Sequence, residues 1–172
     1  MLSSSRILIA LTLCFSTIAI ADDKTDILAV ADEALEKITA EDSAGLAGLM
    51  IEEAMIYVGD VHEGKYRVRT RTYADTRDRA IEVDLVERGW DPTLLVSGTI
   101  GIVWYPYDIY VDSAWSHCGI DIFNMIRTDE GWRIAVLQYN VLQPPACERI
   151  RTGHRLRSLN DAKLKFRNLG SE

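Results

Sequence analysis

Residues 116–123, SHCGIDIF, place three residue types that are common in active sites within an otherwise apolar run. On a β-strand, His117 and Asp121 lie on the same face as Gly119 and Phe123, because successive side chains alternate between faces. The Cα atoms of His117 and Asp121 are then roughly 13 Å apart at about 3.3 Å per residue, which is too far for a hydrogen-bonded dyad. Any joint role must act through a ligand or a water molecule that lies along the strand.

A carboxylate in a pocket can act as a general acid or base when its environment raises its pKa. Burial raises the pKa of a residue such as Asp121 unless an arginine or hydrogen-bond donors compensate. An unperturbed histidine titrates at about pH 6.5, so His117 can also carry a proton in the neutral range. Asp121 and His117 are therefore candidate catalytic residues; the alternative is that both are satisfied polar groups at the edge of the core.

No further motif supplies a nucleophile, a phosphate-binding loop or a metal site. Cys118 faces away from His117 on the same strand, which argues against a Cys–His nucleophilic pair. His62 and His154 lie far away in sequence, and no His, Asp or Glu spacing is typical of a metal site. The sequence therefore predicts neither a metal nor a cofactor, and it leaves open whether the protein is an enzyme.

The final hairpin indicates which side chains surround Asp121. If the chain turns at residues 129–131, Asp121 lies opposite Tyr139 and Phe123 lies opposite Leu137. Aromatic and aliphatic side chains around one carboxylate are typical of a small-molecule pocket. The expected pocket residues are Tyr105, Tyr107, Phe123 and Tyr139.

Residues 104–110, WYPYDIY, present the same choice between a binding site and a core. Pro106 within a strand indicates an edge or a bulge. Two registers remain open, because a one-residue change in the turn at 112–114 reverses which side chains share the face of His117. That face carries either Tyr105 and Tyr107 or Trp104, Asp108 and Tyr110, and in the second case Asp108 is another candidate carboxylate.

Residues 66–72, YRVRTRT, alternate strictly and predict a strand with Arg67, Arg69 and Arg71 on one face. Such a basic face could hold an anionic ligand. Rows of this kind are more often solvated or paired with surface carboxylates, and we expect that outcome here.

The amino-terminal residues predict export. Arg6 precedes an apolar run at 7–20, which is too short to span a bilayer and ends in a small-x-small cleavage pattern at Ala19–Ala21. A lipoprotein signal at Cys14 is the alternative, but a bulky Leu13 argues against it. We expect a signal peptide at 1–21, a periplasmic or secreted protein, and no integral membrane span after its removal.

Two cysteines remain after the signal peptide, and an oxidising compartment allows them to join. The hairpin register puts Cys118 near Leu142, and Pro144 and Pro145 can bend the chain back towards Cys147. The sequence therefore predicts one structural disulfide between Cys118 and Cys147.

The charge divides the chain into an acidic body and a basic tail. Residues 22–147, long enough for one domain, carry 11 basic and 23 acidic side chains, whereas residues 148–172 carry 7 basic and 3 acidic ones. An acidic body argues against nucleic acid as a partner, because phosphate binding needs a concentrated basic surface. The tail could contact an anionic membrane surface or the acidic body, although a solvated extension is the simpler interpretation.

The remaining pattern predicts helices followed by long strands. Apolar positions at helical spacing from Thr25 predict a first helix, and Asp42 is placed to cap a second. A third helix is expected at 75–88, stopped by Gly89. Strands are expected at 54–58, 66–72, 94–111, 115–127 and 132–142.

This order of elements, and above all residues 101–141, resembles the SnoaL-like branch of the nuclear transport factor 2-like superfamily, whose members often end on a Gly-Trp-Arg/Lys-Ile strand after a charged hairpin. The resemblance implies an α+β fold in which N-terminal helices pack in a strongly bent antiparallel sheet that forms a cone with an internal pocket. It also implies several uses of that pocket: isomerisation, dehydration, cyclisation, epoxide opening, or binding and dimerisation without chemistry.

Three functional hypotheses follow. In the first, the protein binds a small, largely apolar molecule, with Asp121 and His117 as acid/base or anchoring groups. In the second, it is a non-catalytic homodimeric module that buries an outer sheet face containing Ile120, Ile122, Ile134 and Val136. In the third, the basic tail contacts a membrane surface or a partner.

Overall fold

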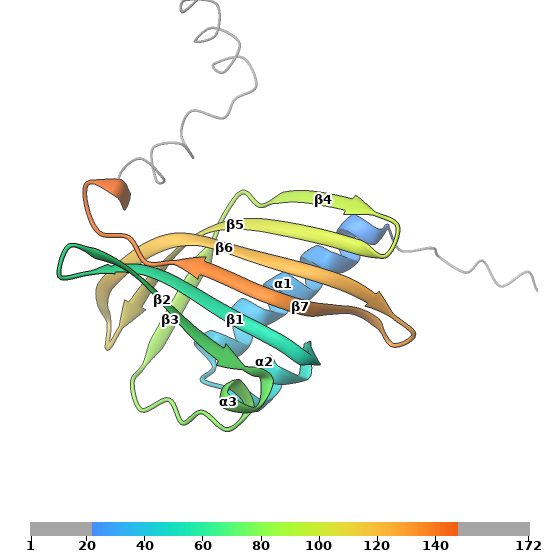
Figure 1. The fold of residues 1–172 in the computed structure, drawn as a ribbon, viewed down its shortest axis with the longest axis horizontal. Coiled ribbons are helices and arrows are strands. Elements are labelled where there is room, and N and C mark those ends of the chain that lie inside the picture. The colour runs from blue at the N-terminus through green and yellow to red at the C-terminus, as the bar shows by residue number, and fades with distance from the viewer. Residues whose placement is uncertain (1–21, 148–172) are drawn as a thin grey trace, which may run out of the picture.

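The computed structural model describes residues 22–147 (Figure 1). Its helices are α1 (Asp23–Thr39), α2 (Ser43–Gly48) and α3 (Tyr73–Arg77). Its strands are β1 (Met50–His62), β2 (Lys65–Thr72), β3 (Leu85–Gly89), β4 (Thr93–Ser97), β5 (Ile100–Val111), β6 (Ala114–Thr128) and β7 (Gly131–Asn140). The expected signal peptide at 1–21 and the basic tail at 148–172 lie outside the described residues.

The strands form one sheet in the order β2-β1-β7-β6-β5-β3, and β4 also pairs with β5. Neighbouring strands are antiparallel except β1 and β7, which run parallel. The sheet curves strongly, stays open at its edges and lies against the helices (Figure 1). The α+β architecture that the resemblance implied is therefore confirmed, with one parallel pair in the sheet.

The helices pack on the inner face of the sheet. α1 buries one apolar stripe, and the Asp42 side chain caps α2 as expected by accepting a hydrogen bond from the Gly45 N–H at 2.7 Å. Inward-facing side chains of β1, β5, β6 and β7 complete the core. Its fully buried members include Ile27, Ala31, Ile56, Val103, Phe123 and Ile134.

The helix expected at 75–88 is wrong beyond its first turn. α3 ends at Arg77, and residues 85–89 form β3, which pairs with β5 in five consecutive register pairs. Apolar positions in this stretch fit a helical period by coincidence, and pairing with β5 overrides that local preference. The strand expected at 94–111 is likewise divided into β4 and β5 by a turn at Gly98, whose φ of +59° suits glycine.

β5 has two partners along one edge. β4 pairs with its first half and β3 with its second half, and Pro106 lies between the two paired stretches. A proline fits there, because its missing N–H removes no bond to β3 or β4. The Pro106 carbonyl still accepts a hydrogen bond from the Trp90 N–H at 3.1 Å.

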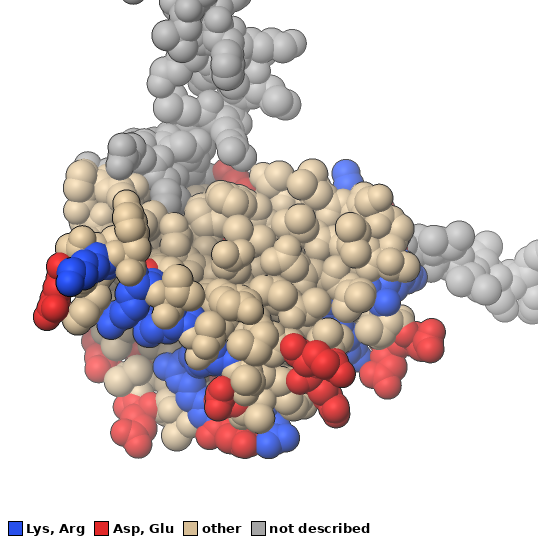
Figure 2. Space-filling model, in the orientation of Figure 1, with Lys and Arg blue, Asp and Glu red and all other residues tan. Residues whose placement is uncertain are grey.

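The outer face of the sheet points away from α1 and is largely uncharged. Lys, Arg, Asp and Glu gather along the lower edge of the view in Figure 2, whereas the surface over β5, β6 and β7 is nearly free of them. Trp104 is 45% exposed on this face, and Ile120, Ile122 and Val136 are partly exposed. Large apolar side chains therefore meet solvent here.

Ile134, which we expected on the same outer face, belongs to the core. Met125 pairs with Ile134 and the preceding Asn124 pairs with Val136, so Ala135 is an extra residue in β7. This bulge reverses the alternation of side chains and turns Ile134 inward, where it is fully buried.

A disulfide joins Cys118 to Cys147, with the Cα atoms 5.7 Å apart, and this confirms the expected pairing. Cys118 pairs with Leu142 through an isolated bridge, and a cis peptide bond joins Pro144 and Pro145. The segment after β7 is therefore attached to β6. None of the helices in residues 22–147 has the length and apolar character needed to cross a membrane.

Candidate functional site

A cavity of about 310 Å³ lies between the inner face of the sheet, the ends of α1 and α2, and the segment before β3. Strands β2, β3, β5, β6 and β7 all contribute to it. Nine of its lining side chains are aliphatic: Ile38, Leu46, Ile81, Val83, Leu85, Ile109, Val111, Leu137 and Val141. Its polar side chains are Lys37, Asp42, Ser43, Arg69, Arg71, Thr76, Arg79, Glu87, Tyr107, His117, Asp121 and Tyr139.

Two carboxyl groups from different strands meet in this cavity. Asp121 on β6 is 3% exposed, and Glu87 comes from β3, the strand that sequence reasoning took for a helix. The Glu87 and Asp121 side chains are placed to share a hydrogen bond when one of them is protonated. Among the described residues, no N–H or hydroxyl donor reaches the buried Oδ2 atom of Asp121. The two acids therefore have each other as neighbours rather than a compensating cation.

Burial and this pairing hold a proton at neutral pH. The pKa of Asp121 is raised well above its ordinary value, first by burial and then by the charge of Glu87 and the hydrogen bond with it. Burial raises the pKa of Glu87 to about 7, although the hydrogen bond with Asp121 partly offsets the rise. A protonated Asp121 that donates to Glu87 is the expected state near neutral pH.

His117 lies at the same cavity, two residues before Gly119 and on the same face of β6 as Asp121. Its Nδ1 atom is 2.9 Å from the Ser116 hydroxyl, and its ring contacts that of Tyr107 edge-on with centroids 5.9 Å apart. Burial lowers the pKa of His117, and the positive charge of Arg69 lowers it further. The imidazole is therefore largely uncharged at neutral pH and able to accept a proton.

Gly119 allows the chain segments around Tyr107 to approach closely. A Cβ atom at this position would lie 2.0 Å from the Asn140 carbonyl oxygen and 2.7 Å from the Tyr107 ring. The Tyr107 hydroxyl donates a hydrogen bond to the same carbonyl at 2.9 Å, and the Asn140 side chain accepts one from the Ile120 N–H at 2.8 Å. β6 and β7 are thus held together past their last register pair, and Tyr107 is fixed against the cavity.

The structure divides the residues that we expected at a pocket. Tyr107 and Tyr139 line the cavity together with His117 and Asp121. Phe123 is completely buried and belongs to the hydrophobic core. Tyr105 also packs in the core, where its hydroxyl donates to Asp32 at 2.9 Å, and burial raises its pKa to about 12. The hairpin pairing of Asp121 with Tyr139 and of Phe123 with Leu137 is confirmed.

The open register of 104–110 is settled by the pairing of β5 with β6. Tyr105 pairs with Asp121 and Tyr107 pairs with Gly119, so these tyrosines share the inner face of the sheet. Asp108 is almost completely buried outside the cavity, where Arg88 donates to both of its carboxylate oxygens at 2.9 and 2.7 Å. The position and pairing of Asp108 favour a structural role.

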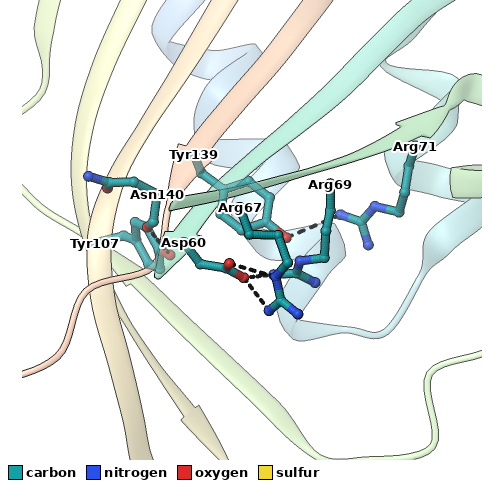
Figure 3. Close-up of polar contacts among 7 residues, drawn as sticks. All are labelled: Asp60, Arg67, Arg69, Arg71, Tyr107, Tyr139 and Asn140. Carbon is teal, nitrogen blue, oxygen red and sulfur yellow. Dashed lines mark hydrogen bonds and ion pairs between the residues drawn. The ribbon is translucent and has the colours of Figure 1, made fainter. Parts of the chain in front are cut away.

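The arginine row on β2 has two different environments (Figure 3). Arg67 and Arg69 both donate to Asp60 on β1, as expected for a paired row, and the hydrogen bonds from Arg67 lower the pKa of Asp60 to about 2. Arg71 lies apart from them and donates to the Tyr139 hydroxyl at 3.4 Å. Arg71 thus faces the cavity, which the sequence pattern did not distinguish.

Sequence reasoning missed Glu87, the partner that changes the chemistry of Asp121. The alternation Leu85-x-Glu87-x-Gly89 was the available signal, but it is short and was read as part of a helix. In residues 22–147 no group of three or more His, Cys, Asp and Glu side chains is arranged to hold a metal ion.

Comparison with known proteins supports the fold. No family model matches the sequence, and no curated protein does. A protein from Cytophaga hutchinsonii described as NTF2-like (nuclear transport factor 2-like) is 12% identical over 70% of this chain and 99% of its own, with a TM-score of 0.58. An NTF2-like protein with a cystatin-like fold from Novosphingobium aromaticivorans is 13% identical over 74% and 88%, with a TM-score of 0.57.

A third similar structure is described as a ketosteroid isomerase-like protein from Erwinia carotovora atroseptica. It is 11% identical over 72% of this chain and 99% of its own, with a TM-score of 0.54. At such low identity a structural likeness carries the fold and not the activity. Residues 22–147 therefore have the nuclear transport factor 2-like fold, in which a bent sheet encloses a pocket against its helices.

Proposed function

We propose that this protein binds a small, largely apolar molecule in the cavity and can transform it by proton transfer. The observation that carries the proposal is the Glu87–Asp121 pair, two acids that face each other in the cavity and, among the described residues, form no ion pair with the lysine or the arginines that also line it. Such an arrangement costs folding free energy, and groups with raised pKa values are concentrated at functional sites. The cavity volume of about 310 Å³ is at the small end of the range for ligand pockets.

The acid/base assignment follows from the protonation states. Asp121 holds a proton that it can donate to an acceptor on the ligand, such as a carbonyl oxygen. Glu87, with a pKa of about 7, and the uncharged His117 are both able to accept a proton from another part of the ligand. His117 and Asp121 act on different ends of the cavity, because they are four positions apart on β6, or roughly 13 Å at about 3.3 Å per residue.

The first experiment is native mass spectrometry of the protein purified without reductant from its exported fraction. A reproducible added mass that is lost on gentle activation supports the pocket function and supplies the ligand for turnover assays. Asp121→Asn and Glu87→Gln should then reduce turnover of that ligand by at least about 100-fold, as expected for removal of a general acid or base. Unchanged turnover in both variants would exclude the acid/base assignment.

The outer sheet face favours a second function, assembly into a homodimer with or without chemistry. Ile100, Trp104 and Ile126 are exposed there in a surface almost free of charge (Figure 2). Contiguous apolar surface of this kind is typical of an interface. Sedimentation equilibrium at micromolar concentration should show a dimer that Trp104→Glu converts to a monomer; a monomeric wild type would end this alternative.

The proposed location is the periplasm or the exterior of the cell. The Cys118–Cys147 disulfide supports it, because disulfides persist in oxidising compartments. Removal of residues 1–21 is checked by amino-terminal sequencing of the exported protein. A role of residues 148–172 at a membrane surface or partner is tested separately by deleting them and measuring liposome binding.

A further inference from the structure

Arg71 is the arginine of the β2 row whose charge the protein leaves uncompensated. Arg67 and Arg69 share the carboxylate of Asp60, which their three hydrogen bonds occupy. Arg71 has a hydrogen bond to the Tyr139 hydroxyl, and its Nε atom is buried without a hydrogen-bond partner. Within residues 22–147, no carboxylate lies within ion-pair distance of Arg71 or of Arg79. A partly buried guanidinium whose buried Nε donor has no partner is costly unless something binds it.

The surroundings of Arg71 increase this cost. Burial lowers the pKa of Arg71, and the positive charges of Arg79 and Arg69 lower it further. All three arginines line the cavity. Repulsion among the like charges that line the cavity is relieved when an anion enters it.

The acidic side chains nearby are already engaged. The charge of Arg71 helps to lower the pKa of Asp75, but the larger cause is the pair of hydrogen bonds that Asp75 accepts from the N–H and hydroxyl of Thr72 in a capping box. Asp42 accepts from Lys37 at 3.0 Å and from the N–H of Gly45. The Glu87–Asp121 pair retains a proton between its members. None of these groups replaces an anion at the free donor of Arg71.

An arginine fork suits a carboxylate. The planar guanidinium presents parallel N–H donors that match the two oxygens of a carboxylate, and the Tyr139 hydroxyl adds a third polar group. In the part of the chain that the structure describes, Arg71 and Arg79 both lack an ion pair, but of the two only Arg71 has a buried donor atom without a partner, and a single carboxylate can satisfy it. The aliphatic wall then accommodates the remainder of the molecule, and the acid pair lies at another part of the same cavity.

We propose that Arg71 is the anion-binding residue of the cavity, assisted by Arg69 and Arg79, and that the ligand is a small amphipathic carboxylate. The inference rests on the proposed function, since it assigns the charged end of the molecule that the cavity holds. The carboxylate lies at Arg71 and Tyr139, and its apolar part extends along the aliphatic wall towards Asp121.

The test uses three probes with the same alkyl chain and different heads: octanoate, octanol and octyl phosphate. Binding to residues 22–172 is measured by isothermal titration calorimetry and by the rise in melting temperature. Wild type should bind octanoate more tightly than octanol or octyl phosphate. Arg71→Met, which keeps an unbranched apolar stem and removes the charge, should weaken octanoate binding about 10- to 100-fold and leave octanol binding unchanged. Arg71→Lys should recover part of the loss.

Arg67→Met is the matched control, because Arg67 lies on the same strand face, outside the cavity lining, and Asp60 keeps Arg69 as a partner. It should bind octanoate like wild type. Arg71→Met should retain or increase the melting temperature of the ligand-free protein, which shows that it folds.

Each contrary result has its own meaning. Equal octanoate binding by wild type and Arg71→Met overturns the inference, as does equal binding of octanoate and octanol by wild type, and the latter leaves an apolar binding pocket in place. Tighter binding of octyl phosphate overturns the choice of a carboxylate. Absence of binding by all three probes overturns the inference as stated, whereas the proposed function is judged separately by the mass retained in native mass spectrometry.

Discussion

Two buried aspartates on neighbouring strands have opposite environments. Asp108 on β5 is 1% exposed and receives two hydrogen bonds from Arg88, whereas Asp121 on β6 is 3% exposed and faces another acid, Glu87. The two aspartates are similarly buried, but Asp108 is paired with a cation whereas Asp121 faces a second carboxyl group. Burial of a carboxylate therefore does not mark a functional site; the identity of its partner does.

The largest change in the free energy of unfolding is expected when Asp108 loses its partner. Arg88→Ala leaves a buried carboxylate without its cation and should lower the free energy of unfolding by about 3–5 kcal/mol. Urea unfolding at pH 7 measures this. Arg77→Ala, which removes the partner of the exposed Asp78, should cost less than about 1 kcal/mol. Similar losses in the two variants would remove the structural role given to Asp108.

The disulfide lies next to Asp108, because Cys118 on β6 is the register partner of Asp108 on β5. Cys147→Ser should lower the free energy of unfolding by about 3 kcal/mol in the chain-entropy model, which depends on the 29-residue separation of the two cysteines. Proteins comprising residues 22–172 are compared by urea unfolding without reductant. Two thiols that react with an alkylating agent in the oxidised wild type would contradict the pairing.

At Asp121 the change in the free energy of unfolding should have the opposite sign. Asp121→Asn keeps the shape and a donor to Glu87 while removing the acid that burial penalises, so it should raise the free energy of unfolding by about 1–3 kcal/mol at pH 8. Asp108→Asn is the matched control and should lower it. If both changes destabilised the protein, the two aspartates would both have a stabilising, structural role.

The same comparison predicts a pH dependence. Raised pKa values of Asp121 and Glu87 mean that the folded state binds these protons more tightly, so their favourable contribution is complete below about pH 4 and is lost as the pH rises through 7. The advantage of Asp121→Asn over wild type should therefore grow between pH 5 and 8 on the order of 1 kcal/mol or more. A constant difference over this range would contradict the shared proton.

The smallest effect concerns His117. Burial and the charge of Arg69 lower its pKa, so the imidazole signals in NMR spectra should titrate below pH 6.5, and Arg69→Met should move the midpoint upward. Arg133→Met, on the hairpin after β6, is the control and should leave the midpoint unchanged. An unaltered midpoint in Arg69→Met would show that burial alone sets the pKa.

Local pairing was predictable from the sequence, and pairing between distant segments was not. The β6–β7 hairpin turns between Thr128 and Gly131, and the extra residue Ala135 then shifts the register by one, so that Asp121 lies opposite Tyr139 as predicted. Glu87 could not be placed in this way, because β3 is recognised as a strand only through its pairing with β5. Ile134 was misplaced for a related reason, since one bulged residue reverses the faces of a strand.

The same division applies to the arginines. Alternation in β2 placed Arg67, Arg69 and Arg71 on one face, but no local pattern shows that Arg67 and Arg69 pair with Asp60 whereas Arg71 contacts Tyr139. That distinction depends on Tyr139 of β7, which the strand order places one strand away from β2, across β1. The sequence therefore predicted some residues of the candidate site, such as Asp121 and Tyr139, but not Glu87 or the separate role of Arg71.

The parallel pairing of β1 with β7 has a consequence for folding kinetics. Met55 pairs with Val136 and Gly59 with Asn140, so forming this pair closes a loop of roughly 80 residues and gives the fold a high contact order. Arg71 follows β1 through the β1–β2 hairpin, and Tyr139 and Asp121 belong to the hairpin on the other side. The cavity can form only after β1 has paired with β7. A ligand therefore cannot bind to, or stabilise, the early stages of folding. It stabilises the folded protein instead.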